Sequence, residues 1–142
     1  MNEILPILFA VLAGIFTTME ASINAKLGRI VTPNIATVHS LITGVVVIVI
    51  INILKGTLNQ YSKIIYVRPQ WLIGGVFGTF IIYLVTKTIP QLGVTTTLTI
   101  VVSAQVISGL FVDVFILREQ QLYLYKLSGV ILFIIGTYFV IK

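Results

Sequence analysis

Long apolar runs separated by short polar breaks dominate the pattern of this chain. Reading from one charged, Pro or Gly break to the next gives five runs, residues 4–24, 34–54, 70–88, 93–117 and 122–141. A helix needs about 20 mainly apolar residues to cross a bilayer. The pattern therefore predicts five transmembrane helices in a single domain of residues 1–142. Pro90 is expected to end the third helix, because proline has no N–H to donate.

The fourth run opens with "VTTTLTIVV", a β-branched stretch that would favour a strand in water. In a bilayer only helices and closed barrels satisfy the backbone hydrogen bonds. A single chain built from such long apolar segments is not a barrel. The predicted fold class is therefore an all-α integral membrane protein.

Composition supports this class and excludes several functions. Hydrophobic residues make up 58% of the chain and charged residues 9%, against about 25% charged residues in soluble domains. The net charge of +5 comes from basic residues that stand singly between apolar runs, which does not indicate nucleic-acid binding. Cysteine is absent. No phosphate-binding glycine loop, metal-ligand spacing or nucleophile constellation is present, so neither an enzyme, a metal site nor a cofactor is expected.

The N-terminus opens with "MNE", which lacks the basic residues of a signal peptide, so the first run is expected to be a retained helix.

The basic residues show almost no bias between the two sides of the membrane. Five spans place five of them on the N-terminal side and four on the other: Lys55, Lys63, Arg68, Arg118 and Lys126 against Lys26, Arg29, Lys87 and Lys142. A protein with one fixed orientation normally carries a clear excess on its cytoplasmic side. Either a few residues set the orientation, or the chain inserts both ways and the two forms pair as an antiparallel dimer.

Glu20 is the most unusual residue of the first run. Thr17, Glu20 and Asn24 follow i, i+3, i+7 spacing and share one helix face. An ionisable group costs about 2.5–3.5 kcal/mol near the centre of a membrane helix. With the helix expected to end near Asn24, Glu20 lies about one turn inside that end. Two interpretations stay open: it reaches the interface and pairs with Lys26 or Arg29, or it lines an aqueous cavity where a proton and a substrate compete for it.

The fourth run places Gln105 at its midpoint, the most costly depth for a polar group. Gly109 and Asp113 follow on the same face, and Ser103 lies nearby. Gln105 either makes a structural hydrogen bond to another helix or, in an antiparallel dimer, meets its own copy at equal depth. Two copies of Glu20 would then lie toward opposite membrane faces. The candidate substrate-binding or ion-coupling residues are Glu20, Asn24, Gln105 and Ser103, with no catalytic residue.

The other polar and small residues singled out by the pattern are expected to have structural roles. Asp113 is expected to pair with Arg118 or Lys126, and His39 to be hydrogen-bonded packing rather than a metal ligand. Small residues four apart allow close helix contact. This spacing occurs in Gly74 with Gly78, Ala104 with Ser108, and Ser40 with Gly44.

The segments "EASINAKLG", "WLIGGVFGTFIIYLVTKTIPQLGVTTTLTIVVSAQVISGLFVDVF" and "LSGVILFIIGTYFVI" resemble the YdcZ-type proteins. These form a five-helix branch of the drug/metabolite transporter (EamA-like) superfamily. The resemblance implies one inverted-repeat unit of a ten-helix assembly in a bacterial inner membrane. It also implies an antiparallel homodimer or, less in keeping with the balanced charges, a heterodimer with a paralogue.

The position of Glu20 usually holds glutamine in that family pattern. The nearest mechanistic analogy is to small multidrug resistance proteins, dual-topology dimers with a glutamate in the first helix; it is analogy alone.

Together these features predict a small secondary transporter of a small molecule. It would work by alternating access as an antiparallel homodimer among membrane lipid, with proton coupling through Glu20. Glu20 favours a cation or proton, whereas Lys26 and Arg29 at the rim favour an anion. The rival is a non-transporting membrane subunit whose polar residues serve only assembly with a partner protein.

Overall fold

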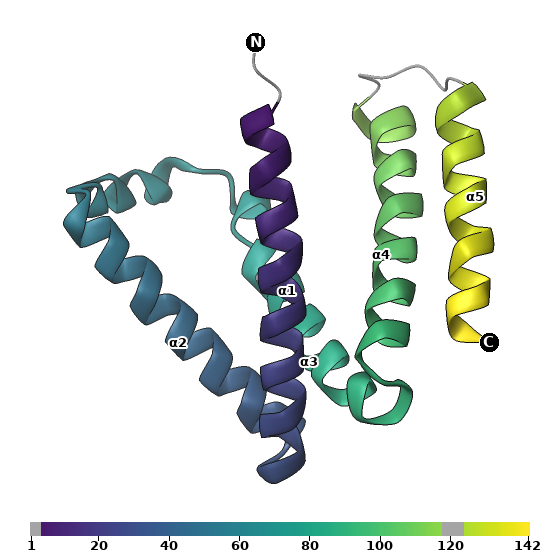
Figure 1. Cartoon of the computed structure of the whole chain (residues 1–142). Helices are drawn as coiled ribbons and strands as arrows, with labels where there is room; N and C mark the ends of the chain where they lie inside the picture. Colours follow the sequence, from purple (N-terminus) through teal and green to yellow (C-terminus); the bar gives the residue numbers. More distant parts are fainter. Residues whose placement is uncertain (1–3, 118–123) are drawn as a thin grey trace. The chain divides into compact units, whose positions relative to one another are not determined.

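The computed structural model describes residues 4–117 and 124–142, and within these ranges every regular element is a helix (Figure 1). The chain divides into two compact units, residues 1–91 and 92–142. The elements are α1 (Ile4–Ile30), α2 (Pro33–Leu54), the 3₁₀ helices η1 (Leu58–Tyr66) and η2 (Pro69–Trp71), α3 (Gly74–Leu92), α4 (Val94–Phe111), the π-helical turn η3 (Val112–Leu117) and α5 (Leu124–Ile141).

Within the described residues, four stretches are long and apolar enough to cross a membrane, which confirms a multi-pass all-α protein. They are Ile4–Ile30, Pro33–Leu54, Pro69–Leu92 and Val94–Phe115. The fifth predicted helix is present as α5, but its described apolar stretch, Leu127–Ile141, is shorter. A fifth span therefore stays a prediction.

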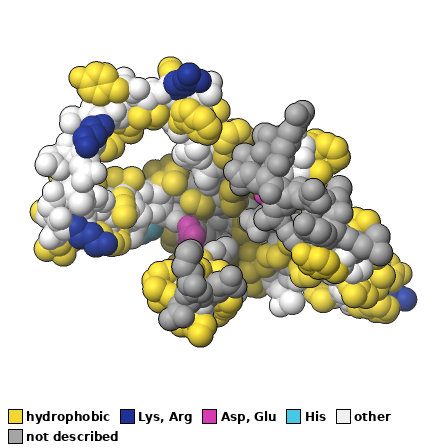
Figure 2. Space-filling model, turned by 90° about the horizontal axis from the view of Figure 1, so that it is seen from above, with side chains coloured by type: hydrophobic (Ala, Val, Ile, Leu, Met, Phe, Trp, Pro, Cys, Tyr) yellow, Lys and Arg dark blue, Asp and Glu magenta, His cyan; other side chains and the backbone are white. Residues whose placement is uncertain are grey.

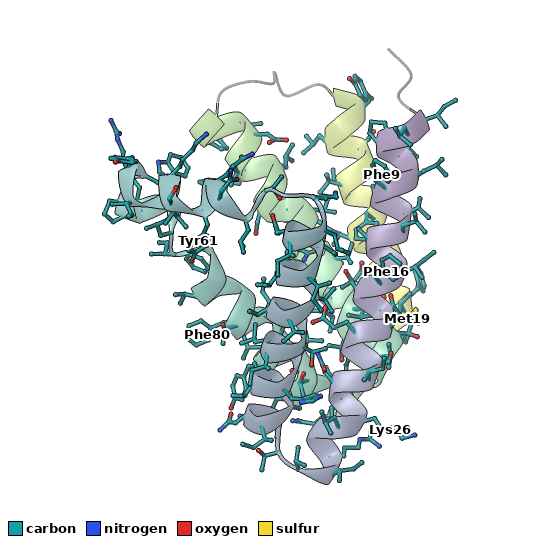
Figure 3. All side chains as sticks on the ribbon, turned by 90° about the vertical axis from the view of Figure 1, so that its left-hand side faces the viewer. Phe9, Phe16, Met19, Lys26, Tyr61 and Phe80 are labelled. Carbon is teal, nitrogen blue, oxygen red and sulfur yellow. The ribbon has the colours of Figure 1, made fainter. Side chains whose placement is uncertain are left out.

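Most large apolar side chains of the described residues face outward, as lipid contact requires. Phe9, Phe16 and Met19 project from α1 with more than half of their surface exposed (Figure 3). Membrane helices associate through close packing of small residues rather than through a large apolar core. The buried hydrophobic residues of the described ranges fit this rule: Ala21, Ala25, Ala36 and Ile89.

In the first unit, α1 and α2 meet near their connection and splay apart toward the other end (Figure 1). The first helix was predicted to end near Asn24 but continues to Ile30. The prediction was wrong because Lys26 and Arg29 were read as a break. Lys and Arg are good helix formers whose long side chains carry the charge to water. α2 then begins at Pro33, with the Thr32 hydroxyl accepting a hydrogen bond from the Ile35 N–H at 3.2 Å.

Pro90 does not end α3, which continues to Leu92. A proline in the last turn removes only one intrahelical hydrogen bond, the one to the Thr86 carbonyl. The terminal carbonyls of a helix need outside donors, and the Arg29 Nη2 donates to the Pro90 carbonyl oxygen at 3.4 Å. Gly93 follows with φ of 82°, a conformation that favours glycine.

In the second unit, α4 and α5 lie side by side (Figure 1). A regular helix was predicted from residue 93 to 117, but its last six residues form the π-helical turn η3. Such turns widen the helix locally and are found mostly as single turns.

Candidate functional site

Three polar side chains form a hydrogen-bonded chain where α1 packs on α2. The Asn24 Nδ2 donates to the Ser40 Oγ at 3.1 Å, and the Ser40 hydroxyl donates to the Glu20 Oε1 at 3.2 Å. Glu20 and Asn24 lie four residues apart on α1, so one face presents both of them to Ser40 on α2. A hydroxyl can accept and donate at once, which lets Ser40 link the amide to the carboxylate.

Exposure increases along this polar chain. Asn24 is buried with 5% of its surface exposed, Ser40 is half-buried, and Glu20 is exposed. The chain therefore runs from the tight α1–α2 contact toward the side where the two helices splay apart. Its outer end is a carboxylate that can accept a proton, a cation or a donor from a ligand.

Glu20 lies much deeper along its helix than the sequence suggested. Because α1 ends at Ile30 rather than near Asn24, Glu20 stands ten residues, or about 15 Å, from that end. The middle of Ile4–Ile30 is residue 17, so Glu20 is three residues, about 4.5 Å, from the middle. Glu20 therefore stands well within α1 rather than one turn from its end.

The expected ion pair of Glu20 with a neighbouring cation is not found within the described residues. Arg29 instead donates to the Pro90 carbonyl of α3, and Lys26 points outward into the surroundings (Figure 3). The partner of Glu20 is the neutral Ser40 hydroxyl. Its negative charge is therefore not compensated by any cation among the residues that the structure describes.

Thr17 does not join this group, because its hydroxyl donates to the Ala13 carbonyl of its own helix at 2.9 Å. Ser40 is the residue that sequence reasoning missed as a site member; it was considered only as a packing partner of Gly44. The available signal was a serine in the N-terminal part of α2, where it is one of several polar residues. Nothing in one sequence could show that it faces Glu20.

Ser103 and Gln105 lie on different sides of α4. Ser103 is buried, and its Oγ lies 2.7 Å from the Thr137 Oγ1 of α5 and 2.7 Å from the Thr99 carbonyl oxygen. Two residues along a helix correspond to about 200° of rotation, so Gln105 points away from that contact. Gln105 is exposed, makes no side-chain hydrogen bond within the described ranges, and stands at the middle of the helical run 94–117. A site shared by Gln105 with Glu20 and Asn24 of the first helix stays a prediction.

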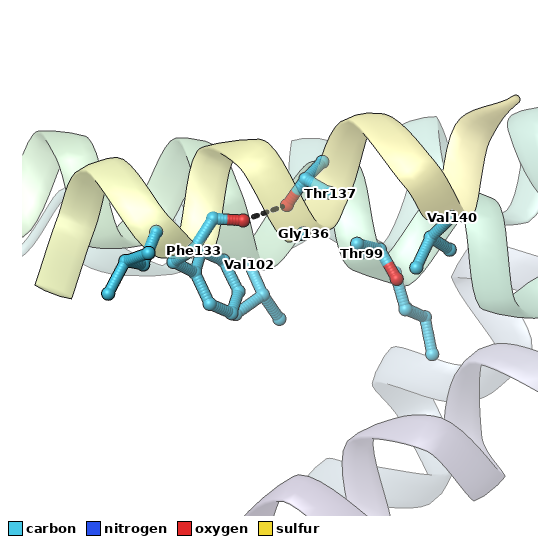
Figure 4. Close-up of a pocket in the computed structure, with 8 residues that line it drawn as sticks. Thr99, Val102, Phe133, Gly136, Thr137 and Val140 are labelled. Atoms are coloured by element: carbon cyan, nitrogen blue, oxygen red, sulfur yellow. Dashed lines mark hydrogen bonds between the residues drawn. The ribbon is translucent and has the colours of Figure 1, made fainter.

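Two grooves lie along the α4–α5 pair. The groove of about 530 Å³ between α4 and α5 is mainly apolar, with Thr99 and Thr137 as its hydroxyl groups (Figure 4). A second groove on the same pair, of about 460 Å³, holds the half-buried Asp113 between Gly109 and Gly129. The partners expected for Asp113 fall outside the description: Arg118 lies beyond the described ranges, and the Lys126 side chain is not described.

The expected packing glycines have open surroundings in the single chain. A Cβ added at Gly74 or Gly78 would meet nothing within 4 Å, and Ala104 and Ser108 are exposed. Close packing there stays a prediction. The tight position is Gly28, where a Cβ would lie 2.8 Å from the Thr86 Cγ2 of α3.

No group of histidine, cysteine or carboxylate side chains suited to a metal occurs among the described residues. His39 is exposed rather than packed, and its side chain makes no hydrogen bond within the part of the chain that is described.

Comparison with known proteins places these features in a family. Residues 5–139 match the family model described as "Putative inner membrane exporter, YdcZ". The inner membrane protein YdcZ of Escherichia coli (strain K12) is 26% identical over 148 aligned positions, which cover 100% of this chain and 98% of that protein. No solved structure matches the chain significantly.

The family match extends over nearly the whole chain, and the structure supplies several helices that can span a membrane. The protein is accordingly a multi-pass protein of the inner membrane, and its family is one of exporters rather than of enzymes. With the sequence match and the helical architecture in agreement, this chain belongs to the YdcZ family of inner membrane proteins.

Proposed function

We propose that this protein is a small secondary transporter that exports a small molecule as an antiparallel homodimer, each chain supplying one inverted repeat of a ten-helix assembly. In this proposal α5 is the fifth span. The hydrogen-bonded chain from Asn24 through Ser40 to Glu20 is the observation that carries the proposal. In the same proposal Gln105 and Ser103 of α4 contribute to the substrate path, and Ser103 also contacts Thr137 of α5.

Glu20 lacks a compensating charge among the described residues. A carboxylate within a membrane helix needs a partner, a water-filled cavity or a proton. Here its partner is a neutral hydroxyl, and no cation of the described residues compensates it. A proton or a cationic group of the substrate can supply that compensation, and the two exclude each other at one carboxylate. Such competition is the simplest basis for proton-coupled export.

The depth of the polar residues supports antiparallel pairing. Only residues near the middle of a helix reach the same depth in two chains of opposite orientation. Gln105 is at the middle of its helical run, and Glu20 is about 4.5 Å from the middle of α1. The near-equal charge count, five against four, agrees with both orientations being inserted.

Titration of ligand binding tests the proton coupling. A thermal-shift screen of cations, anions and metabolites on the purified protein first identifies a ligand, and its affinity is then measured across pH. Glu20→Gln is expected to abolish the pH dependence and to leave the dimer intact. Asp113→Asn is the matched control and is expected to keep the pH dependence of ligand binding. An unchanged pH profile in Glu20→Gln would refute the proton role.

Labelling from each side of the membrane tests the dimer. Because the chain has no cysteine, Lys26→Cys and Lys63→Cys each provide a single reactive site on opposite sides of the bilayer. Each is expected to react with an impermeant reagent from both sides. Reaction from one side alone would exclude dual topology, and association only with a different protein would favour the rival, a non-transporting subunit.

A further inference from the structure

The connection between α2 and α3 is a surface segment with helical structure of its own. Residues 55–71 contain the 3₁₀ helices η1 and η2, and none of the residues in either helix is buried. In Figure 1 this segment crosses the upper ends of α2 and α3, within the first unit. We call residues 55–71 the surface segment.

The direction of the surface segment is fixed where it leaves α2. Gly56 adopts φ of 65°, which ends α2. The Thr57 hydroxyl then donates to the Asn52 Oδ1 at 2.7 Å, while the Asn52 Nδ2 donates to the Ile48 carbonyl oxygen at 2.8 Å. These side-chain bonds turn the chain out of the α2 axis at a defined point.

The surface segment carries an apolar stripe that is open to its surroundings. A 3₁₀ helix has three residues per turn, so residues three apart share a face. Leu58, Tyr61 and Ile64 form one such face, with 44%, 70% and 36% of their surfaces exposed. Beyond η1, Trp71 is 71% exposed. Tyr and Trp at helix ends are typical of the interface between lipid headgroups and acyl chains.

The charges of the surface segment all have one sign. Lys55, Lys63 and Arg68 are exposed, and the segment contains no Asp or Glu. Figure 2 shows Lys and Arg side chains spaced along the outer rim of this part of the molecule rather than gathered at one point. Cations spaced along an apolar stripe at a membrane surface complement a layer of anionic headgroups, whereas one buried anion would need them to converge.

We propose that the surface segment is a binding surface for anionic phospholipid headgroups. Tyr61, Trp71 and the apolar stripe insert at the level of the headgroups, and Lys55, Lys63 and Arg68 contact their phosphates. Each basic residue near an anionic membrane surface contributes about fivefold in affinity. This inference rests on the surface segment alone and stands whether or not the proposed transport activity is found.

The chain contains its own probe for this surface, because Trp71 is its single tryptophan. The full-length protein is reconstituted into vesicles of phosphatidylcholine and phosphatidylglycerol, in which one lipid or the other carries brominated chains that quench tryptophan on contact. At equal mole fractions of the two lipids, brominated phosphatidylglycerol is expected to quench Trp71 more strongly than brominated phosphatidylcholine. The difference should correspond to a severalfold enrichment of phosphatidylglycerol around Trp71. High salt should reduce the enrichment, since the screening length falls to about 3 Å at 1 M.

Charge variants test whether the three cations cause the preference for the anionic lipid. The triple variant Lys55→Gln, Lys63→Gln, Arg68→Gln is expected to lose the preference, and each single variant to lower it about fivefold at most. The control removes three exposed cations that lie outside the surface segment: Lys26→Gln, Lys87→Gln and Lys142→Gln. This control keeps the enrichment, and so do Lys55→Arg and Lys63→Arg.

Three outcomes would overturn the proposal. Equal quenching by the two lipids in the unaltered protein would remove the basis for anionic selectivity. Enrichment that survives the triple variant would show that these cations do not cause it. Loss of enrichment on adding inorganic phosphate at constant ionic strength would identify a free anion, rather than the lipid headgroup, as the ligand.

Discussion

Gly28→Ala tests the contact that positions α1 against α3. An added Cβ would lie 2.8 Å from the Thr86 Cγ2 and 3.4 Å from the Pro33 Cα, where carbon atoms normally stay about 3.5–4.0 Å apart. Thr86 is 1% exposed, so it has no open space into which to move. Overpacking of this kind costs about 1–3 kcal/mol. Alanine recovers about 1 kcal/mol through its higher helix propensity.

The expected net loss is therefore about 1 kcal/mol in the free energy of unfolding, measured by titration with SDS in mixed micelles. Gly78→Ala is the matched control: it makes the same chemical change inside a helix where the new Cβ meets nothing within 4 Å. It should be neutral or stabilising by up to about 1 kcal/mol. The difference between the two variants isolates the clash.

Thr86→Ser removes the methyl group that the new Cβ would meet. The double variant Gly28→Ala, Thr86→Ser should regain most of the lost stability, with a coupling energy of about 1–2 kcal/mol between the two sites. If Gly28→Ala unfolds at the same SDS concentration as Gly78→Ala, or if Thr86→Ser restores nothing, α1 and α3 do not make this contact.

Further changes probe the other hydrogen bonds. Asn24→Ala and Ser40→Ala, combined in a double-mutant cycle, should show a coupling of about 0.6 kcal/mol, the average for interhelical hydrogen bonds in membranes; additive losses would mean that the bond is absent. Ser103→Ala and Thr137→Val should couple by up to about 1.7 kcal/mol because their bond is buried, and a coupling near zero would exclude it. Arg29→Gln removes a cation from the C-terminal end of α3 and should cost about 0.3–1 kcal/mol, with faster hydrogen exchange in the last turn of α3; unchanged exchange there would contradict the capping role.

The sequence predicted the fold class well because the length and spacing of apolar runs follow directly from the thickness of a bilayer. The ends of the helices were harder to predict. Lys26 and Arg29 looked like the end of the first helix, yet their side chains tolerate a helix that leaves the apolar layer. Pro90 looked like a stop, but in a last turn its missing N–H costs a single hydrogen bond.

The candidate site was predictable in part. Glu20 and Asn24 stand out because polar groups are costly within an apolar run, and their spacing places them on one face. Ser40 could not be identified, because its role depends on how α2 packs against α1, which no local pattern encodes. Ser103 bonds to Thr137, thirty-four residues later in the chain, which no local pattern indicates, and its role toward a substrate stays a prediction. Periodicity predicts which residues share one face of a helix, but it does not predict which other helix packs against that face.

Pro90 has a consequence for how α3 can move. A helix normally resists bending because each turn must break main-chain hydrogen bonds on its convex side. At the turn between Thr86 and Pro90 one of these bonds is absent from the start, so main-chain hydrogen bonding resists bending there less than in the middle of α3. The buried Thr86 and the bond from Arg29 to the Pro90 carbonyl oxygen hold this turn from outside its own helix. The direction of the last turn of α3 therefore depends on its contacts with α1 more than on its own main chain.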